Sequence, residues 1–538
     1  MLSREINGLK TLAKRLLASP FLVYFLEMKA RFRLSPKEKE FIRHNKRVWG
    51  PYAVEEVQGT IVLDIFEVEE ILITYSYFAN ILARKYQSKI VNYIYGYNLV
   101  SHKYNLIYKS FNTRETVRIL ATTIQKKEVK RLYQNFIAKL KTREDLFNFH
   151  IEGCHIGIDI YESYLRDYNQ YTVNLDDENL QYLIKAAITI YIFWRDYFEK
   201  NKVKAYVNTH DSYVWMNIGC KIAYKNNIPV YLPNARGATY CTEPFSIQAC
   251  YKNYPKIFNL LSEEAKKKAM DFSMTRLHKR FSGAVGVDMF YSTAASFGET
   301  SGPRQVKKSD KIKILVATHC FFDNPHAFQI LPFLDFYDWM IFLGEISEET
   351  NYDWYVKIHP DPLPDTEEII RSFIKKYPKF NYIHHNIKHN QLIEEGIDVA
   401  LTCYGSIGEE YPYYDKLVIN TGYNPRVAYD FNVHSNTQAE YRRNLLNIPK
   451  LLNNYKVDKN QLYEFYYVHN ILNWVDDMLF NSYYEFLEKL TDKERRTCKV
   501  YRFFLDQFSE EYHQKILNKY ESFIASRKKN IFSIGPVE

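Results

Sequence analysis

Short apolar runs alternate with stretches of helical periodicity along two long parts of the chain. In the first part, this pattern predicts buried strands at residues 89–95 (KIVNYIY), 203–208 (VKAYVN) and 228–232 (IPVYL). A helical period over Val214–Tyr224 separates the last two runs. These three segments predict a strand–helix–strand unit of a parallel sheet.

A second alternating set begins near residue 311. Helical segments such as Thr366–Lys376 separate most of its apolar runs. Strands are predicted at residues 313–318 (KILVAT), 354–358 (WYVKI), 381–384 (NYIH), 398–402 (DVALT) and 416–420 (KLVIN). Five strands with such crossovers indicate a doubly wound α/β domain.

The stretch between the two sets, STAASFGETSGPRQVKKSD, has the composition of an interdomain linker. We therefore predict an N-terminal α/β domain at 51–291, a linker at 292–310, a second α/β domain at 311–454 and a helical extension at 455–538. Two such domains would enclose a ligand cleft, with the carboxyl ends of both sets of strands as its walls.

Residues 1–50 form a separate N-terminal segment. Apolar side chains at positions 6, 9, 12, 13, 16 and 17 follow helical spacing, and Arg4, Lys10 and Lys14 lie on the other side. This pattern predicts a basic amphipathic helix on an anionic membrane surface. A helix that packs on the protein's own surface is the alternative. No apolar stretch reaches 18 residues, so no transmembrane helix is expected.

Charge and cysteine content narrow the class of protein. The 72 basic and 63 acidic residues give a net charge of +9, which permits an anionic partner without requiring nucleic acid. The 7 cysteines form no C-x-x-C pair, and this favours a reducing cytoplasm. The motifs of a P-loop, a dinucleotide site and a metal site are missing from the sequence, so no metal or cofactor is expected.

Polar residues follow three predicted strands of the second domain. The parallel strands would bring these loops together at one sheet edge, where α/β proteins bind ligands. The candidates are His319, Asp323 and His326 in the first loop, Lys357, His359 and Pro360 in the second, and Gly405, Ser406, Ile407 and Glu410 in the third.

The side chains in these loops suit a nucleotide-sugar donor. His359 could hold a phosphate oxygen, with Pro360 fixing the turn. Gly405 and Ser406 would offer backbone N–H groups and a hydroxyl to a phosphate. Glu410, one turn further, could accept hydrogen bonds from ribose hydroxyls. The alternatives are structural: a solvated or capping histidine, and an ordinary helix N-cap at Ser406.

VKIHP followed by GSIGEEYPYYDKLVINTG resembles bacterial capsule and lipopolysaccharide glycosyltransferases of the GT-B type, including Kdo- and sialic-acid-transferring members with a His-Pro motif. THCFFDNPH is similar to a segment of related capsule-biosynthesis proteins. The chain departs from the pattern at Asp415, where glycine is usual, and at Leu417, where proline is usual. The resemblance covers about residues 150 to 450 and implies two Rossmann-like domains.

The same resemblance places the acceptor in the first domain, where an inverting transfer needs a general base. Asp211, after the strand VKAYVN, is the first candidate, with His210 beside it. Asp159 and Glu162 compete for this role. Asp211 as a helix N-cap remains the alternative. Arg166 and Arg236 could bind an acidic sugar or a phosphate, or form surface ion pairs.

These observations predict a metal-independent, cytoplasmic glycosyltransferase on the inner face of the membrane. It would move a sugar from a nucleotide-sugar donor, with a CMP-linked donor favoured, to a lipid-linked or other glycan precursor of the cell surface. One alternative is a polyol-phosphate transferase of the teichoic-acid type. The other is a non-catalytic protein of polysaccharide assembly.

Overall fold

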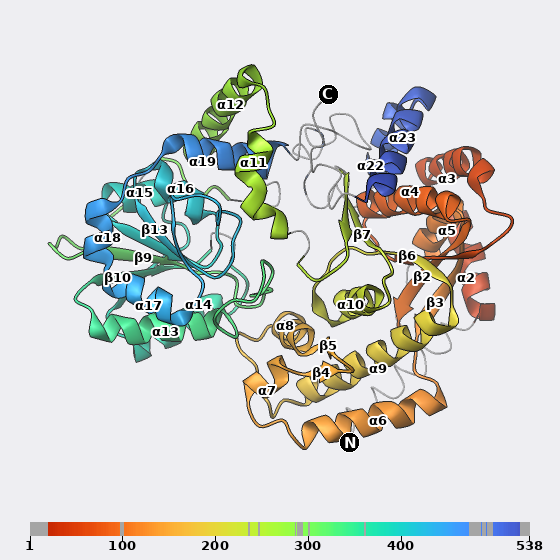
Figure 1. Cartoon of the computed structure of the whole chain (residues 1–538), viewed down its shortest axis with the longest axis horizontal. Coiled ribbons are helices and arrows are strands. Elements are labelled where there is room, and N and C mark those ends of the chain that lie inside the picture. Colours follow the sequence, from red (N-terminus) through yellow and green to blue (C-terminus); the bar gives the residue numbers. More distant parts are fainter. Residues whose placement is uncertain are drawn as a thin grey trace.

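The computed structural model describes residues 20–96, 102–234, 237–245, 248–285, 287, 294–299, 302–359, 362–472, 486, 491 and 499–527. Figure 1 shows two sheet domains side by side, each with helices on both faces of its sheet. The predicted fold class is confirmed: both domains are doubly wound and Rossmann-like, a GT-B-like architecture.

The N-terminal sheet has the strand order β3-β2-β1-β6-β7-β8. Neighbouring strands are parallel, apart from the antiparallel pair β7 and β8. Its strands are β1 (Gly59–Asp64), β2 (Ser88–Tyr95), β3 (Thr113–Ile119), β6 (Val203–Val207), β7 (Val230–Asn234) and β8 (Gly237–Cys241). The chain thus crosses from one side of β1 to the other, which opens a ligand crevice between the carboxyl ends of β1 and β6.

The C-terminal sheet repeats this order as β11-β10-β9-β12-β13-β14, with every pair parallel. Its strands are β9 (Lys313–Ala317), β10 (Asp353–Lys357), β11 (Phe380–Ile383), β12 (Val399–Thr402), β13 (Leu417–Thr421) and β14 (Val433–Ser435). The equivalent crevice lies between the carboxyl ends of β9 and β12.

Helices cover both faces of the N-terminal sheet. They are α2 (Pro20–Arg33), α3 (Pro36–Trp49), η1 (Gly50–Tyr52), α4 (Glu69–Lys85), α5 (His102–Ser110), α6 (Thr123–Ile137), α7 (Arg143–Phe147), α8 (Gly157–Asp167), α9 (Glu178–Lys200), the π-helical turn η2 (Tyr213–Asn217) and α10 (Ile218–Lys225). A small hairpin of β4 (His150–Ile151) and β5 (Cys154–His155) precedes α8.

The remaining helices belong mainly to the C-terminal domain. They are η3 (Gln248–Asn253), α11 (Tyr254–Phe258), α12 (Glu263–Phe281), α13 (Phe336–Glu349), α14 (Thr366–Lys376), α15 (His389–Glu394), α16 (Ile407–Tyr413), α17 (Gln438–Leu446), α18 (Ile448–Asn454), α19 (Lys459–Tyr466) and η4 (Tyr467–Ile471). Both α11 and α12 pack against α19 and η4, so this part of the chain joins the C-terminal domain before the C-terminal sheet begins.

The last described helices return to the N-terminal domain. Both α22 (Lys499–Gln507) and α23 (Glu510–Ser526) cover α3 and α4, as Figure 1 shows. Tyr501 stacks on Phe41 with ring centroids 4.5 Å apart, and Tyr520 meets Phe78 edge-on at 4.9 Å. All four rings are almost fully buried. The core of the first domain is therefore completed by residues from the end of the sequence.

The described residues of the predicted linker pack on the C-terminal domain. Phe297 is buried and stacks on His389, with ring centroids 5.2 Å apart. The Glu395 carboxylate accepts hydrogen bonds from the backbone N–H groups of Gln305 and Val306, each at 2.7 Å. These contacts fix the entry of the chain into β9.

A buried polar joint connects the two domains. The Asp335 carboxylate, fully buried at the start of α13, accepts hydrogen bonds from the Tyr161 hydroxyl at 2.6 Å and the Thr172 hydroxyl at 2.8 Å. The Arg143 guanidinium reaches Asp335 at 3.3 Å and Asp338 at 2.9 Å. Three residues of the first domain therefore hold the N-terminus of one helix of the second.

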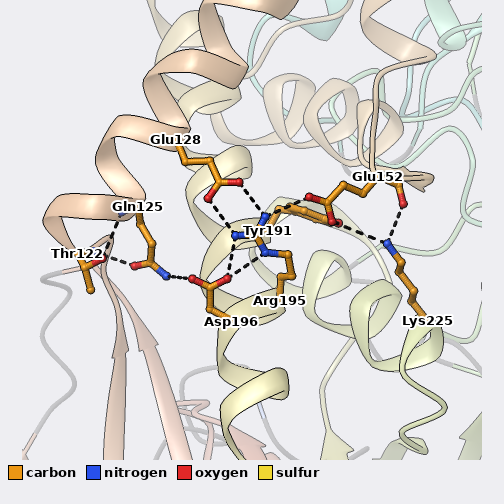
Figure 2. A network of polar contacts seen from close by, with 8 residues as sticks. All are labelled: Thr122, Gln125, Glu128, Glu152, Tyr191, Arg195, Asp196 and Lys225. Atoms are coloured by element: carbon orange, nitrogen blue, oxygen red, sulfur yellow. Dashed lines mark hydrogen bonds and ion pairs between the residues drawn. The ribbon is translucent and has the colours of Figure 1, made fainter.

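A second polar network braces the helices behind the N-terminal sheet (Figure 2). Arg195 of α9 binds both Glu128 oxygens of α6, at 2.8 and 2.9 Å, and contacts Glu152 in the β4–β5 turn at 3.1 Å. The Tyr191 hydroxyl and the Lys225 amine also contact Glu152. A bidentate arginine–carboxylate pair is geometrically specific, so this network sets how α6 and the hairpin lie on α9.

The N-terminal helix α2 packs on α5 and is held there by an ion pair of 2.6 Å between Lys109 and the buried Glu27. The apolar spacing predicted over residues 6–17 lies outside the described residues. Within the described part of the chain, no helix is both long and apolar enough to cross a bilayer.

Candidate functional site

The crevice of the N-terminal sheet contains a carboxyl group that the sequence patterns did not single out. Asp64 ends β1, is buried, and accepts a 3.0 Å hydrogen bond from the Thr209 hydroxyl, which follows β6. Burial raises the pKa of Asp64 to about 7. The signal for this residue was available: an aspartate follows the apolar run TIVL, at the end of a strand.

The loop after β6 places two of the predicted acid–base residues side by side. His210 is exposed, and Asp211 is half-buried. Desolvation by the surrounding protein and the nearby Arg166 lower the pKa of His210, whereas burial raises the pKa of Asp211. His210 is therefore an accessible, neutral imidazole at pH 7. The N-cap of η2 is Ser212, so Asp211 is not the capping residue of this turn.

The other two acid–base candidates lie on α8 and are already engaged in the fold. Asp159 is buried and paired with the Lys221 amine at 2.6 Å, and Asn217 donates to it at 2.8 Å. Glu162 is also buried, and one of its oxygens accepts the backbone N–H of His326 at 3.1 Å. Burial raises the pKa of both carboxyl groups. Both carboxyl groups are buried and already bonded within the protein. Their predicted role as a general base has no test in these contacts and stays a prediction.

Arg166, at the end of α8, contacts the other domain. Its guanidinium forms a 3.0 Å ion pair with Asp323, in the loop after β9. The side chains predicted separately for the acceptor and the donor thus meet each other across the domain boundary. Arg236 lies outside the described residues.

His319 bridges the crevice of the C-terminal sheet. Its Nε2 atom accepts the backbone N–H groups of Cys403 at 3.2 Å and Tyr404 at 3.4 Å, and it lies 3.0 Å from the Thr402 hydroxyl. Because backbone N–H groups only donate, the neutral ring carries its proton on Nδ1. Burial, with His359 and Arg426 nearby, lowers the pKa of His319 to about 3.

His326, the second histidine of the same loop, is buried among backbone groups. Its Nδ1 atom accepts the N–H of Leu331 at 2.9 Å, and its Nε2 atom donates to the carbonyl of Leu334 at 3.1 Å. Both ring nitrogens are therefore occupied in holding the loop, and a donor-binding role stays a prediction.

The loop after β10 presents its histidine to solvent. His359 is exposed, whereas Lys357 is buried and donates to the carbonyl of His385 at 3.1 Å. Burial and the nearby Lys388 lower the pKa of Lys357 to about 8. His359 also depresses the pKa of His319 through its charge, so the two rings lie in one cluster. Pro360 lies outside the described residues.

The loop after β12 turns tightly at Gly405. A Cβ atom there would lie 2.8 Å from Thr402 Oγ1 and 3.5 Å from the His319 ring, so glycine allows the close approach of these groups. Ser406 is the N-cap of α16 but makes no side-chain capping hydrogen bond, and it is partly exposed. Ile407 is buried in the core. Ser406 is thus available to a ligand, whereas Ile407 packs inward.

The two glutamates of α16 are buried and paired with arginines. Glu410 forms an ion pair with Arg280 of α12, and Glu409 forms one with Arg426. The predicted role of Glu410 toward ribose hydroxyls is therefore untested, and its first partner is a guanidinium from another helix. Asp415 has a φ of +58°, so it adopts the left-handed conformation that the usual glycine would permit.

Across the described residues, no three His, Cys, Asp or Glu side chains converge as a metal site would require. The accessible side chains near the C-terminal crevice include the imidazole of His359 and the hydroxyl of Ser406, which can bind a phosphate oxygen, and the carboxylate of Asp323, which is paired with Arg166.

Comparisons with known proteins found only solved structures with low sequence identity and low TM-scores. No protein-family model matches the chain, and no curated protein matches it. Among solved structures, a Thermosulfurimonas dismutans KpsC, titled a beta Kdo 2,4 transferase, is similar at 12% identity and a TM-score of 0.28, over 49% of this chain and 79% of that one. A Neisseria meningitidis UDP-GlcNAc 2-epimerase, titled as bound to UDP-GlcNAc, is similar at 12% identity and a TM-score of 0.20, over 78% and 96%. The architecture given above depends on the strand order of this chain itself.

Proposed function

We propose that this protein is a metal-independent glycosyltransferase that moves a sugar from a nucleotide-sugar donor to a precursor of a cell-surface glycan. One observation carries the proposal: the loop after β6, with His210, meets the loop after β9, with Asp323, across the domain boundary. Arg166 and Asp323 both act on the pKa of His210 through their charges. The ligand-binding edges of two Rossmann-like sheets thus adjoin one another, as a two-substrate transfer requires.

The donor phosphate would bind at the C-terminal crevice. His359 is exposed there, and Ser406 has a side chain without a capping partner. The Gly405 N–H already donates to Thr402 Oγ1 at 3.0 Å, so these two side chains carry the proposed site. Hydrogen-bond donors placed at a leaving phosphate stabilise the charge that develops on it. A donor linked through CMP remains our first choice of nucleotide.

His210 is the best-placed general base among the predicted residues. In the transfer, the acceptor oxygen attacks the anomeric carbon, and the bond from that carbon to the phosphate oxygen breaks. The bonding electron pair leaves with the nucleotide, and the hydroxyl proton moves to an imidazole nitrogen of His210. The Asp323 carboxylate would stabilise the resulting imidazolium, and such a direct displacement inverts the anomeric configuration.

We also propose that α2 contacts an anionic membrane, where a lipid-linked acceptor would lie. Its inner side is packed on α5, while its outer side combines apolar and basic side chains. The exposed residues are Phe25, Met28, Lys29, Arg31, Phe32 and Arg33. A surface of this composition is typical of helices that lie in a membrane interface.

A thermal-shift panel with CMP, CDP, UDP, GDP and dTDP tests the donor site. A nucleotide present at 100 times its Kd stabilises the folded state by ~2.7 kcal/mol, so one of the five should raise the Tm. His359→Ala should abolish this increase, whereas His278→Ala, an exposed histidine of α12, should retain it. The absence of any shift with all five nucleotides would contradict the proposal and favour a non-catalytic assembly protein.

A further inference from the structure

The N-terminal domain contains a cavity of about 740 Å³ that lies away from both crevices. Three segments that are far apart in the sequence meet around it: the end of α3 with η1 and the turn that follows, the end of α4, and the first turn of α23. The turn after η1 leads into β1 at Gly59, and Gln87 directly precedes β2, so the cavity lies at the amino edge of the sheet. The length of β1, six residues at ~3.3 Å each, separates it from the crevice at the carboxyl edge.

The floor of the cavity includes a buried histidine with an unused nitrogen. His513 of α23 is 4% exposed, and its Nδ1 atom contacts the hydroxyl of the buried Tyr77 of α4. Burial raises the pKa of Tyr77 well above its ordinary value and lowers the pKa of His513, so the phenol keeps its proton and the imidazole is neutral. The hydroxyl therefore donates to Nδ1, and the ring proton is on Nε2. This Nε2–H has no acceptor among the described residues, which leaves a buried donor unsatisfied.

The rim of the cavity carries charges of both signs. Two guanidinium groups and three carboxylates contribute to it, all on exposed side chains: Arg47, Arg84, Glu55, Glu56 and Glu510. None of the five forms an ion pair within the described part of the chain, although all of them surround one cavity. Both donors and acceptors are thus available to a polar ligand.

This set of groups suits a sugar better than an anion. Three carboxylates beside two guanidinium groups leave no excess of positive charge for a phosphate. A carboxylate accepts hydrogen bonds and a guanidinium donates them, and the hydroxyl groups of a sugar do both. A sugar oxygen would also accept the Nε2–H of His513, while Pro51 and Tyr52 offer apolar surface to the C–H groups of a sugar ring. The volume lies within the range of ~300–1,000 Å³ that is usual for ligand sites.

We propose that this cavity is a saccharide-binding site that takes a neutral segment of an oligosaccharide. The site goes beyond the proposed transfer centre, because none of the crevice residues described above lines it. Its role rests on the proposed function: a long acceptor glycan bound here would stay on the protein while another part of it reaches His210. The binding itself requires no donor, so it can be tested on the full chain alone.

The test measures saturation-transfer NMR signals from three neutral probes, maltotriose, chitotriose and mannotriose. At least one of them should give a signal that saturates with concentration. Ala53→Trp places an indole in the cavity without removing a polar group, and it should abolish that signal. Ala138→Trp, at an exposed position at the end of α6, is the matched control and should retain the signal.

Arg47→Ala tests the rim without filling the cavity. It should raise the Kd of the bound saccharide ~10-fold or more, because a hydrogen bond to a charged group is lost. Arg43→Ala removes an exposed arginine of the same helix that does not line the cavity, and it should leave the Kd unchanged. Inorganic phosphate is the fourth probe and should not compete with the saccharide.

Four results would overturn the saccharide site: no saturable signal from the three saccharides, a signal that persists in Ala53→Trp, an unchanged Kd in Arg47→Ala, or phosphate binding that Ala53→Trp abolishes. The nucleotide panel separates this proposal from the proposed function. A saccharide signal without any nucleotide shift would retain the site and reject the proposed function. A nucleotide shift without a saccharide signal would reject the site alone.

Discussion

Asp64 is a carboxyl group whose position at the end of a buried strand makes folding sensitive to pH. Burial raises its pKa in the folded chain to about 7, far above the ordinary value of 3.8. Its contribution to stability is therefore fully present below about pH 4 and is lost as the pH rises to about 7. The hydrogen bond from Thr209 offsets part of this loss.

Asp64→Asn should remove this pH dependence, because an amide has no proton to lose. The difference in unfolding free energy between the variant and wild type should shift in favour of the variant by up to about 4 kcal/mol as the pH is raised from 4 to 7.5. Urea denaturation at several pH values measures the difference. Asp176→Asn, at an exposed position, is the control, and its plot of unfolding free energy against pH should run parallel to that of wild type. Parallel curves for Asp64→Asn would show that the carboxyl titrates normally.

His210 should control the acidic limb of the pH–rate profile if it is the general base. Its lowered pKa means that the neutral, proton-accepting form persists below pH 6.5, so kcat/KM should fall only at a more acidic pH. His210→Gln should lower kcat by roughly 10²- to 10⁴-fold, and the acidic limb of the pH–rate profile should disappear. His278→Gln should leave both unchanged. An unchanged limb in His210→Gln, with the limb lost in Asp211→Asn, would make Asp211 the base.

At the scale of elements, the connection from β12 to α16 depends on the missing side chain of Gly405. Gly405→Ala should cost ~1–3 kcal/mol, because the new methyl group would overlap Thr402 Oγ1, which lies only 2.8 Å from the position of the added Cβ. Gly50→Ala is the matched control, since its Cβ would meet no atom within 4 Å and its backbone is right-handed. Denaturant unfolding measures both changes. Equal stability of the two variants would mean that the loop relaxes freely.

The outer face of α2 should bind anionic vesicles through its basic residues. Replacing Lys29, Arg31 and Arg33 together by Gln should weaken binding roughly 100-fold at low salt, at about 1 kcal/mol for each charge. Replacing Lys126, Lys127 and Lys130 of α6 removes the same charge from an exposed helix elsewhere and is the control. Co-sedimentation with vesicles measures both. Equal losses in the two variants would point to net charge rather than to α2.

Hydrophobic periodicity predicted most of the strands that have an apolar run, and it missed a polar edge strand. The strands β2, β6 and β9–β13 and the helix α14 lie where the apolar runs indicated. The edge strand β3, with the sequence TRETVRI, is largely polar and exposed, so no apolar run marks it. The strand β1 was also missed, although its six residues are all buried and it is longer than β11 and β12, so the pattern offers no reason for this omission.

At the scale of the whole molecule, the first domain depends on the end of the chain. A chain that ends at residue 498 would lack α22 and α23 and would uncover the buried rings of Phe41 and Phe78. Each large core side chain lost costs about 3–5 kcal/mol, and a domain's total stability is about 5–15 kcal/mol. The truncated chain should therefore show fast hydrogen exchange in α4, while α14 in the second domain keeps its protection.

The sequence alone determined the α/β class, the presence of two domains, and the three loops of the second domain that meet at one sheet edge. These properties follow from local periodicity and from the geometry of parallel sheets, which bring the carboxyl ends of strands together. Tertiary structure alone decided which partner each candidate side chain of the two domains binds. Glu410 meets Arg280, Glu162 meets the N–H of His326, and Arg166 meets Asp323. The partners in these pairs lie 130 or more residues apart, and no local pattern encodes such contacts.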